Sequence, residues 1–217
     1  PGDQLEVRAL ASYGFAGRRL HGAVAVSSGQ GIDLTGYRQV RDVADVPVIA
    51  PLLNSIASQE FGDDYGDYYL ATGARAALRR GLGVRGEWRW AATRERIVSL
   101  AVRAQPATGR FRPNPAVRNG DFSVVSLTVR RRSEGFAVRR DLAAELTVEG
   151  GRADGGPGYV RVAAAGHLLV PVGGSRVLVR AQGGAAGDGL PPHRAFVLGG
   201  RGTLLGDEFR QWGGRRA

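Results

Sequence analysis

The chain has 217 residues, a length that one large domain or two small ones could fill. It contains 34 glycines, no cysteine and no methionine, and all 30 basic residues are arginine, which gives a formal net charge of +10. The missing cysteines exclude disulfides and thiolate metal sites. No apolar stretch approaches the roughly 20 residues of a membrane-spanning helix. The arginines are spread along the chain and form no stripe or tail, so nucleic acid is not expected as a partner.

The dominant pattern along the chain is alternation with a period of two residues, which indicates β-strands. In 136–149, Val138, Leu142 and Leu146 fall on one face and most of the charged residues on the other. Strands are expected at 5–15, 18–28, 32–42, 68–80, 84–94, 122–132, 136–149, 159–171 and 175–184. The strand count in 29–67 stays open, because 52–60 looks briefly helical and a further strand could lie within 43–67.

The distribution of charge between the two strand faces favours a barrel in a membrane. In strand after strand, charged residues lie opposite a face rich in valine, leucine, tryptophan and alanine, as a polar lumen and a lipid-facing exterior require. Short turns also contrast with long connections at 95–121, 150–158 and 185–210. We therefore expect an all-β fold, an antiparallel up-and-down transmembrane β-barrel. It would be incomplete, a single partial domain over 1–217 with about nine strands and the start of another.

The same alternation predicts which side chains contact lipid and which line the lumen. The residues expected to contact lipid are Val84, Trp88, Leu142, Leu146, Val160, Val162, Val177 and Val179. The residues expected to face the lumen are Arg85, Glu87, Arg89, Arg139, Asp141, Glu145, Arg161 and Arg180. A soluble arginine-rich β-sandwich that binds anionic polymers is the alternative, although its strands would usually be shorter, about 5–6 residues.

Three local patterns resemble functional motifs but favour structural interpretations. Residues 81–86 match G-x-G-x-x-G, yet 87–93 alternates as a strand where a nucleotide site needs a helix. The acidic and aromatic segment 63–69 lacks the spacing of a calcium loop, so a barrel rim with interfacial tyrosines is preferred over a cation site. The histidines share no metal-ligand spacing. We expect no catalytic, cofactor-binding or metal-binding residues and no enzymatic activity.

The most specific segment lies near the end of the chain. A Phe-x-Leu-Gly-Gly sequence at 196–200 is followed by Gly-Thr-Leu-x-Gly at 202–206. This run resembles the loop that precedes the late strands in barrels of the BamA/TamA type, the bacterial surface-antigen family. The residues of this loop motif are Phe196, Leu198, Gly199, Gly200, Arg201, Gly202, Thr203, Leu204, Leu205, Gly206, Asp207 and Arg210.

The resemblance implies that 191–210 folds inward into the lumen, where an arginine of the family's loop tip bonds to the wall. Leu205 stands where the family has that arginine, and Asp207 stands where it has an aromatic residue. Arg201 or Arg210 would therefore have to supply the charge. Its possible partners on the lumen face are Glu87, Asp141 and Glu145.

The resemblance also implies a location and a function. The protein would lie in the bacterial outer membrane and insert or translocate other outer-membrane polypeptides, without a cofactor. Its partners would be outer-membrane lipid, nascent outer-membrane polypeptides and periplasmic accessory domains or subunits. The chain would be a fragment that lacks periplasmic domains and the closing strands. One further alternative remains, a passive barrel that acts as a channel or as the membrane anchor of a larger, hydrolase-fused protein.

Overall fold

The structure, a computed structural model, describes residues 4–14, 19–43, 57, 60–61, 66–83, 85–101, 106–108, 114, 117–132, 141–198 and 212–216. Nine long strands dominate these residues. They are β1 (Leu5–Gly14), β2 (Arg19–Ser28), β3 (Ile32–Asp42), β4 (Tyr68–Leu82), β5 (Gly86–Ser99), β6 (Gly120–Arg132), β7 (Asp141–Ala153), β8 (Gly158–Val172) and β9 (Ser175–Ala186). A short 3₁₀ turn, η1 (Pro192–Arg194), and two short strands, β10 (Phe196–Leu198) and β11 (Trp212–Gly214), follow.

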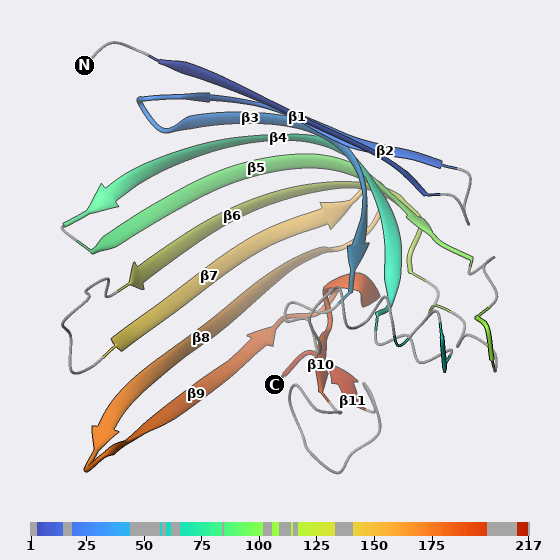
Figure 1. Cartoon of the computed structure of the whole chain (residues 1–217). Helices are drawn as coiled ribbons and strands as arrows, with labels where there is room; N and C mark the ends of the chain where they lie inside the picture. The colour runs from blue at the N-terminus through green and yellow to red at the C-terminus, as the bar shows by residue number, and fades with distance from the viewer. Residues whose placement is uncertain are drawn as a thin grey trace.

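The nine long strands form one antiparallel sheet in which each strand pairs with the next in sequence, from β1 to β9. The sheet curves strongly, and η1, β10 and β11 lie on its concave side (Figure 1). The predicted all-β, up-and-down antiparallel fold is confirmed. The sheet is open: within the described residues, β1 pairs only with β2, and β9 pairs with β8 and meets Arg216 in a single bridge.

The strand positions agree with the alternation, and the differences fall at strand ends. β5 continues to Ser99 and β7 to Ala153, so parts of the expected connections 95–121 and 150–158 are strand. β3 pairs directly with β4, so no other strand lies between them in the sheet. Among the described residues of 29–67, β3 is therefore the one strand. Residues 133–140, where the longest strand was expected to begin, lie outside the described residues.

The two longest connections lie at one end of the sheet, and three short hairpins lie at the other. The hairpins at 29–31, 83–85 and 173–174 lie at one end, here called the hairpin end, and 43–67 and 100–119 lie at the other, the loop end. Residues 81–86 belong to the β4–β5 hairpin, and β5 follows them directly. The helix N-terminus that a nucleotide site needs at 81–86 is therefore not there, as predicted.

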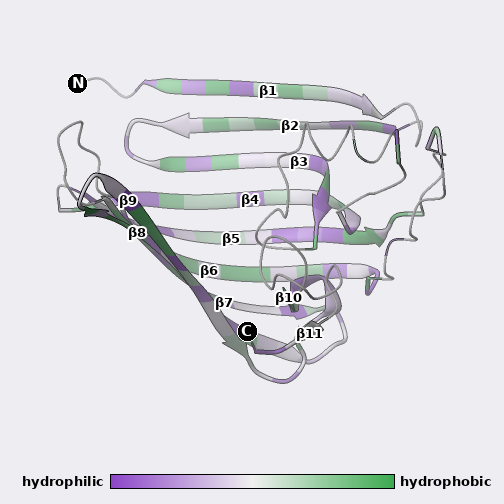
Figure 2. Ribbon diagram, turned by 60° about the horizontal axis from the view of Figure 1, so that its bottom comes forward, coloured by the Kyte–Doolittle hydropathy of each residue, from purple (hydrophilic) through white to green (hydrophobic). Residues whose placement is uncertain are grey.

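Strand register assigns every side chain to one of two faces. Even-numbered residues of β2, β3, β4, β5, β7 and β8 and odd-numbered residues of β1, β6 and β9 lie on the convex face, and the remaining residues lie on the concave face. Most exposed large apolar side chains lie on the convex face, for example Leu34, Leu127, Leu146 and Val162. Green apolar segments recur along the strands in Figure 2. No helix among the described residues has the length and apolarity to cross a membrane.

The apolar core lies on the concave face near the loop end. It consists of Tyr37, Val43, Tyr69, Ala71, Ile97, Val117, Phe122 and Ala153. Because these side chains come from β3 to β7 and from the adjoining connections, the core fixes the curvature of the sheet at this end. Tyr69 is only 3% exposed within it, so the expectation that the tyrosines of 63–69 lie at a membrane interface is wrong for Tyr69.

Candidate functional site on the concave face

The segment that follows β9 turns back onto the concave face. Residues 191–198, here called the docked segment, form the η1 turn and then β10, which pairs antiparallel with β11. Figure 1 shows this segment beneath the arch of β5 to β9. Its side chains contact concave residues of five strands, β4 and β6 to β9, so the segment joins strands that are distant in the sheet.

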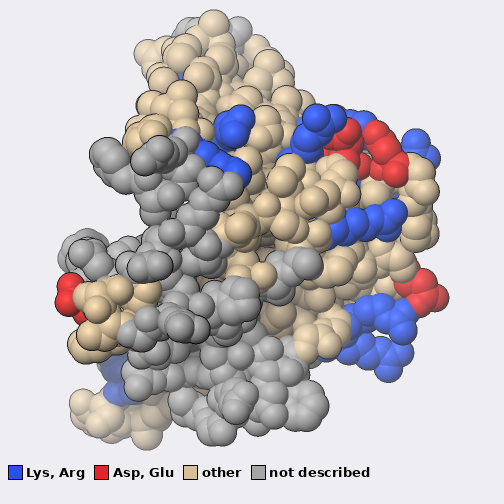
Figure 3. All heavy atoms as spheres, turned by 90° about the vertical axis from the view of Figure 1, so that its right-hand side faces the viewer, with Lys and Arg blue, Asp and Glu red and all other residues tan. Residues whose placement is uncertain are grey.

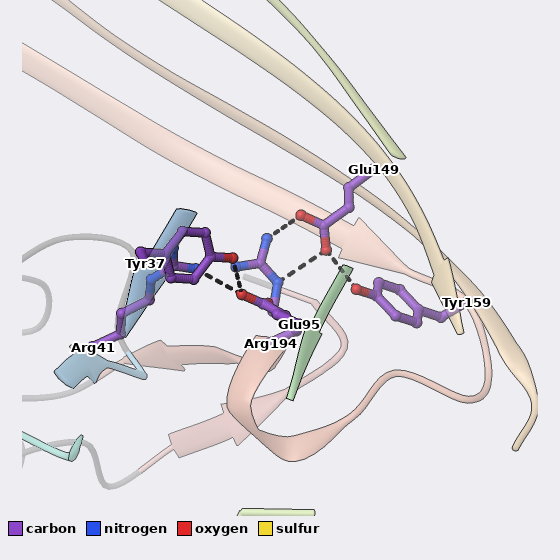
Figure 4. Close-up of polar contacts among 6 residues, drawn as sticks. All are labelled: Tyr37, Arg41, Glu95, Glu149, Tyr159 and Arg194. Atoms are coloured by element: carbon purple, nitrogen blue, oxygen red, sulfur yellow. Dashed lines mark hydrogen bonds and ion pairs between the residues drawn. The ribbon is translucent and has the colours of Figure 1, made fainter. Parts of the chain in front are cut away.

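Arg194 holds the docked segment to the sheet through a charged cluster. Its Nε donates to Oε1 of Glu149 at 2.9 Å, and its second guanidinium nitrogen contacts the other carboxylate oxygen. The Tyr159 hydroxyl donates to the same Oε1 at 2.7 Å. Figure 4 shows Arg194 and Tyr159 converging on the carboxylate from opposite sides. The Glu149 side chain is only 6% exposed, and a buried carboxylate is stable when donors satisfy it in this way.

A second cluster with the same three residue types lies on β3 and β5. The Tyr37 hydroxyl donates to Oε2 of Glu95 at 2.5 Å, and Arg41 donates to the same oxygen at 3.0 Å. Arg41 also lies over the Tyr37 ring, with its Cζ 4.4 Å from the ring centroid. The two Tyr-Glu-Arg clusters face one another across the concave face (Figure 4). One is built within the sheet, whereas the other needs the docked segment.

Two aromatic contacts complete the docking. The His193 ring lies edge-on to Phe122, with ring centroids 4.9 Å apart, and 5.4 Å from Tyr69. The Phe196 ring lies beneath Arg161, whose Cζ is 4.2 Å from its centroid, a favourable cation–π distance. These contacts extend the apolar core from the sheet into the docked segment.

Burial affects the pKa of both ionisable residues of η1, His193 and Arg194. Loss of hydration lowers the pKa of His193 to about 3, so the ring is neutral at pH 7. For Arg194, burial alone would disfavour the charge, but the attraction and hydrogen bonds of Glu149 outweigh it and raise its pKa. The docked segment thus carries one neutral ring and one permanent cation.

The structure places most residues predicted for the lumen on the concave face. By register these are Glu87, Arg89, Glu145, Arg161 and Arg180, and the side chain of Asp141 lies outside the described part of the structure. Arg85 lies in the β4–β5 turn, and Arg139 lies outside the described residues. All the residues expected to contact lipid are on the convex face except Val84, which also lies outside them. That the two faces line a lumen and meet lipid stays a prediction.

Of the predicted loop motif, only Phe196 and Leu198 fall within the described residues. Those outside are Gly199, Gly200, Arg201, Gly202, Thr203, Leu204, Leu205, Gly206, Asp207 and Arg210. The inward fold of the complete 191–210 loop and the roles of Arg201 and Arg210 therefore stay predictions. The described part shows a different arginine, Arg194, bound to a different acid, Glu149, from those that the sequence suggested.

The sequence contains a weak indication of the Arg194–Glu149 contact. Alternation within a single strand does not reveal it. Glu149 precedes Gly150-Gly151, which resembled a loop but continues β7. A Cβ on Gly151 would lie 2.7 Å from Cζ of Tyr159, so glycine there leaves room for the tyrosine that donates to Glu149. The sequence signal for this contact is therefore Gly151, two residues after the buried acid Glu149 and directly opposite Tyr159 of the next strand.

Gly184 of β9 gives a direct test of docking. A Cβ there would lie 2.6 Å from the Val162 carbonyl oxygen and would overlap the Phe196 ring. We predict that Gly184→Ala displaces Phe196, measured as faster amide hydrogen exchange over 192–198. Gly174→Ala, at a turn glycine with open space around its Cβ, is the control. Equal exchange in the two variants would contradict the placement of Phe196.

Comparisons with known proteins leave the family of the chain unassigned. No protein-family model matches the chain, and no curated protein matches it. The described residues also contain no group of three histidine, aspartate or glutamate side chains placed to hold a metal ion. Function must therefore be argued from the two faces of the sheet and from the docked segment.

Proposed function

We propose that the sheet is part of the wall of a bacterial outer-membrane β-barrel that inserts or translocates outer-membrane polypeptides, with lipid on the convex face and the lumen on the concave face. The observation that carries the proposal is the separation of side chains between the two faces. Exposed valine, leucine and tryptophan cover the middle of the convex face, and the concave face holds the buried ion pairs. A soluble sandwich would need a second sheet of comparable extent facing the first, and the described residues on the concave side form only the two three-residue strands β10 and β11.

On β6, the stretch of the convex face without charged residues has about the height of a membrane. On β6 it is bounded by Asp121 and Arg131, ten positions apart. Ten residues extend about 33 Å along a strand, which at a barrel tilt of about 40° gives about 25 Å along the membrane normal. This matches the apolar band of outer-membrane barrels.

The convex face becomes ionic at the loop end. Arg96 pairs with Asp121 at 2.8 Å, and Arg94 pairs with Asp154, between residues of neighbouring strands and connections. Figure 3, viewed from the loop end, shows arginine and acidic side chains beside one another on the surface. Such pairs suit the headgroup region, where water and lipid phosphates are available, and they are costly in the hydrocarbon region.

Two features connect this wall with the proposed activity. The open edges of β1 and β9 would have to be closed by further strands, because backbone groups find no hydrogen-bond partners in lipid. The docked segment occupies the concave face at the position where the family resemblance expects an inward-folded loop. A wall with such a segment supports an assembly barrel more than a simple pore.

A pair of cysteine variants tests the membrane placement. Ala164 and Ala165 of β8 are both exposed, on the convex and concave faces respectively, and the chain has no native cysteine. In isolated outer membranes, we predict that a water-soluble maleimide labels Ala165→Cys at least about tenfold faster than Ala164→Cys. The reason is that lipid excludes the reagent and keeps the thiol protonated.

The same variants in a mild-detergent extract without added lipid provide a control for intrinsic reactivity. Equal labelling in membranes would contradict the barrel wall. Assembly activity needs a separate test in cells of the native organism. Depletion of the protein should lower the amounts of folded outer-membrane proteins, and a normal outer-membrane proteome after depletion would overturn the assembly function.

A passive channel is the second candidate, and one observation favours it. Arginines outnumber acids on the concave face of the described strands, which would attract anions into a pore. Single-channel conductance that persists while assembly in depleted cells is unaffected would favour this candidate.

A further inference from the structure

A group of arginines gathers on the concave face toward the hairpin end, away from the docked segment. Arg79 of β4 and Arg89 of β5 are direct cross-strand partners, and Arg75 lies four residues from Arg79 on the same face. Cross-strand partners have Cβ atoms about 4.5–5.5 Å apart, and like charges at such positions destabilise a sheet. The group therefore needs a compensating charge.

The protein does not supply that charge within its described residues. Two acids lie near the group in register. Glu87 pairs with Arg130 at 2.9 Å, and Arg130 is also 3.8 Å from Glu145. Asp33 is the cross-strand partner of Ala77, which lies between Arg75 and Arg79 on the same face, but no ion pair joins Asp33 to either arginine in the described structure. Glu95 and Glu149 belong to the two Tyr-Glu-Arg clusters. Within the described ranges, no carboxylate lies within ion-pair distance of Arg75, Arg79 or Arg89.

The side chains of Arg75 and Arg89 are also partly removed from water, whereas Arg79 is exposed. The Nε atoms of Arg75 and Arg89 are buried and have no hydrogen-bond partner in the described structure. Arg75 is repelled by both Arg89 and Arg41, and the attraction of Asp33 is weaker than either. A buried donor without an acceptor destabilises the folded protein, so an acceptor that carries negative charge would be bound favourably.

Hydroxyl groups lie next to these donors. Thr93 is the cross-strand partner of Arg75, and Thr128 is the partner of Arg89. Thr128 is also 3.0 Å from the Thr147 hydroxyl. Guanidinium groups with neighbouring hydroxyls are the donor set that recognises tetrahedral oxyanions, because a guanidinium offers two parallel N–H groups to two oxygens.

We propose that Arg75, Arg79 and Arg89, with Thr93 and Thr128, bind a divalent tetrahedral oxyanion of the phosphate type on the concave face. The anion would be free phosphate or the phosphate group of a larger solute. The site depends on the folded sheet but not on which face meets lipid, so it can hold or fail independently of the proposed function.

The test is calorimetric titration of the full chain, folded in non-ionic detergent micelles, with inorganic phosphate at constant ionic strength. We expect saturable binding that Arg75→Gln and Arg89→Gln each weaken about tenfold or more, because each removes a charge-assisted contact. Arg180→Gln, at an exposed concave arginine on β9, should bind as the wild type does. Chloride in place of phosphate should give no saturable signal.

The stability of the variants without phosphate provides a second measurement. Because each substitution removes like-charge repulsion, Arg75→Gln and Arg89→Gln should unfold at or above the wild-type temperature. The proposal is overturned if phosphate does not bind, if both variants bind phosphate as tightly as the wild type does, or if chloride binds equally. It is also overturned if the variants lose stability or fail to fold, which would show that the arginines have protein partners. Phenyl phosphate in a further titration distinguishes the two sources: binding as tight as phosphate indicates a site open to larger solutes, and loss of binding indicates free phosphate.

Discussion

Replacing Glu149 with alanine is expected to release the docked segment, residues 191–198, from the concave face. The substitution leaves the partly buried Arg194 guanidinium without its carboxylate and the Tyr159 hydroxyl without its acceptor. Breaking one side of a buried ion pair costs about 3–5 kcal/mol. The docked segment is short, and the other contacts described between it and the sheet come from the rings of His193 and Phe196, so most of this cost should appear as undocking.

Tryptic cleavage after Arg194 and amide hydrogen exchange over 192–198 measure the release. Glu145→Ala is the matched control, because Glu145 lies on the same face of β7 but makes a weaker ion pair. Its side chain is 52% exposed, and its carboxylate lies 3.8 Å from Nε of Arg130, a long distance for an ion pair. An exposed pair of this kind contributes about 0–1 kcal/mol, so the control should leave the segment docked. If both alanine variants exchange alike, Arg194 does not hold the segment.

Strand positions could be predicted from the sequence because the two faces of each strand meet different environments. The apolar and charged residues therefore alternate within the strand itself. The alternation of Val160 and Val162 with Arg161 is visible without knowing any neighbour. The end of β5 was missed because Arg94 and Arg96 place charge on the face that is apolar earlier in the strand. Their partners, Asp154 and Asp121, come from elsewhere in the chain, and no pattern within one strand reveals them.

The candidate site was harder to predict for the same physical reason. Glu149, Tyr159 and Arg194 lie on β7, β8 and η1, and only the register of the sheet brings them together. The family resemblance directed attention to an inward segment but placed its arginine after Leu198. Of the contacts that the structure shows, Phe196 belongs to the predicted motif. His193 and Arg194 precede it, in a proline- and glycine-rich stretch that offers no motif.

Mild acid is expected to undock the same segment through His193. The ring is 3% exposed, and among the described residues its Nδ1 has no hydrogen-bond partner. The groups that contact or flank it are Tyr69, Phe122 and Arg194, none of which can stabilise a second positive charge. The docked state therefore keeps His193 neutral, with a pKa of about 3 against 6.5 in the released segment.

Because the pKa of His193 is lower in the docked segment than in the released one, acid favours release. Between pH 6.5 and pH 3 the released segment binds a proton that the docked segment does not, so docking is complete above this window and weakens as the pH falls through it. At pH 4.5, two units below the ordinary value, the loss is about 3 kcal/mol. Docking should be unaffected between pH 7 and pH 8.

His193→Phe separates this mechanism from general acid denaturation. Phenylalanine keeps a ring between Tyr69 and Phe122 but cannot be protonated, so its docked segment should stay protected at pH 4.5. Hydrogen exchange over 192–198, corrected for the intrinsic pH dependence of exchange, compares the two proteins. A ring-carbon NMR titration of wild-type His193 should show no protonation down to pH 4.5 while the segment stays docked. Identical acid release in the phenylalanine variant would assign the transition to another group and leave His193 as a packing residue only.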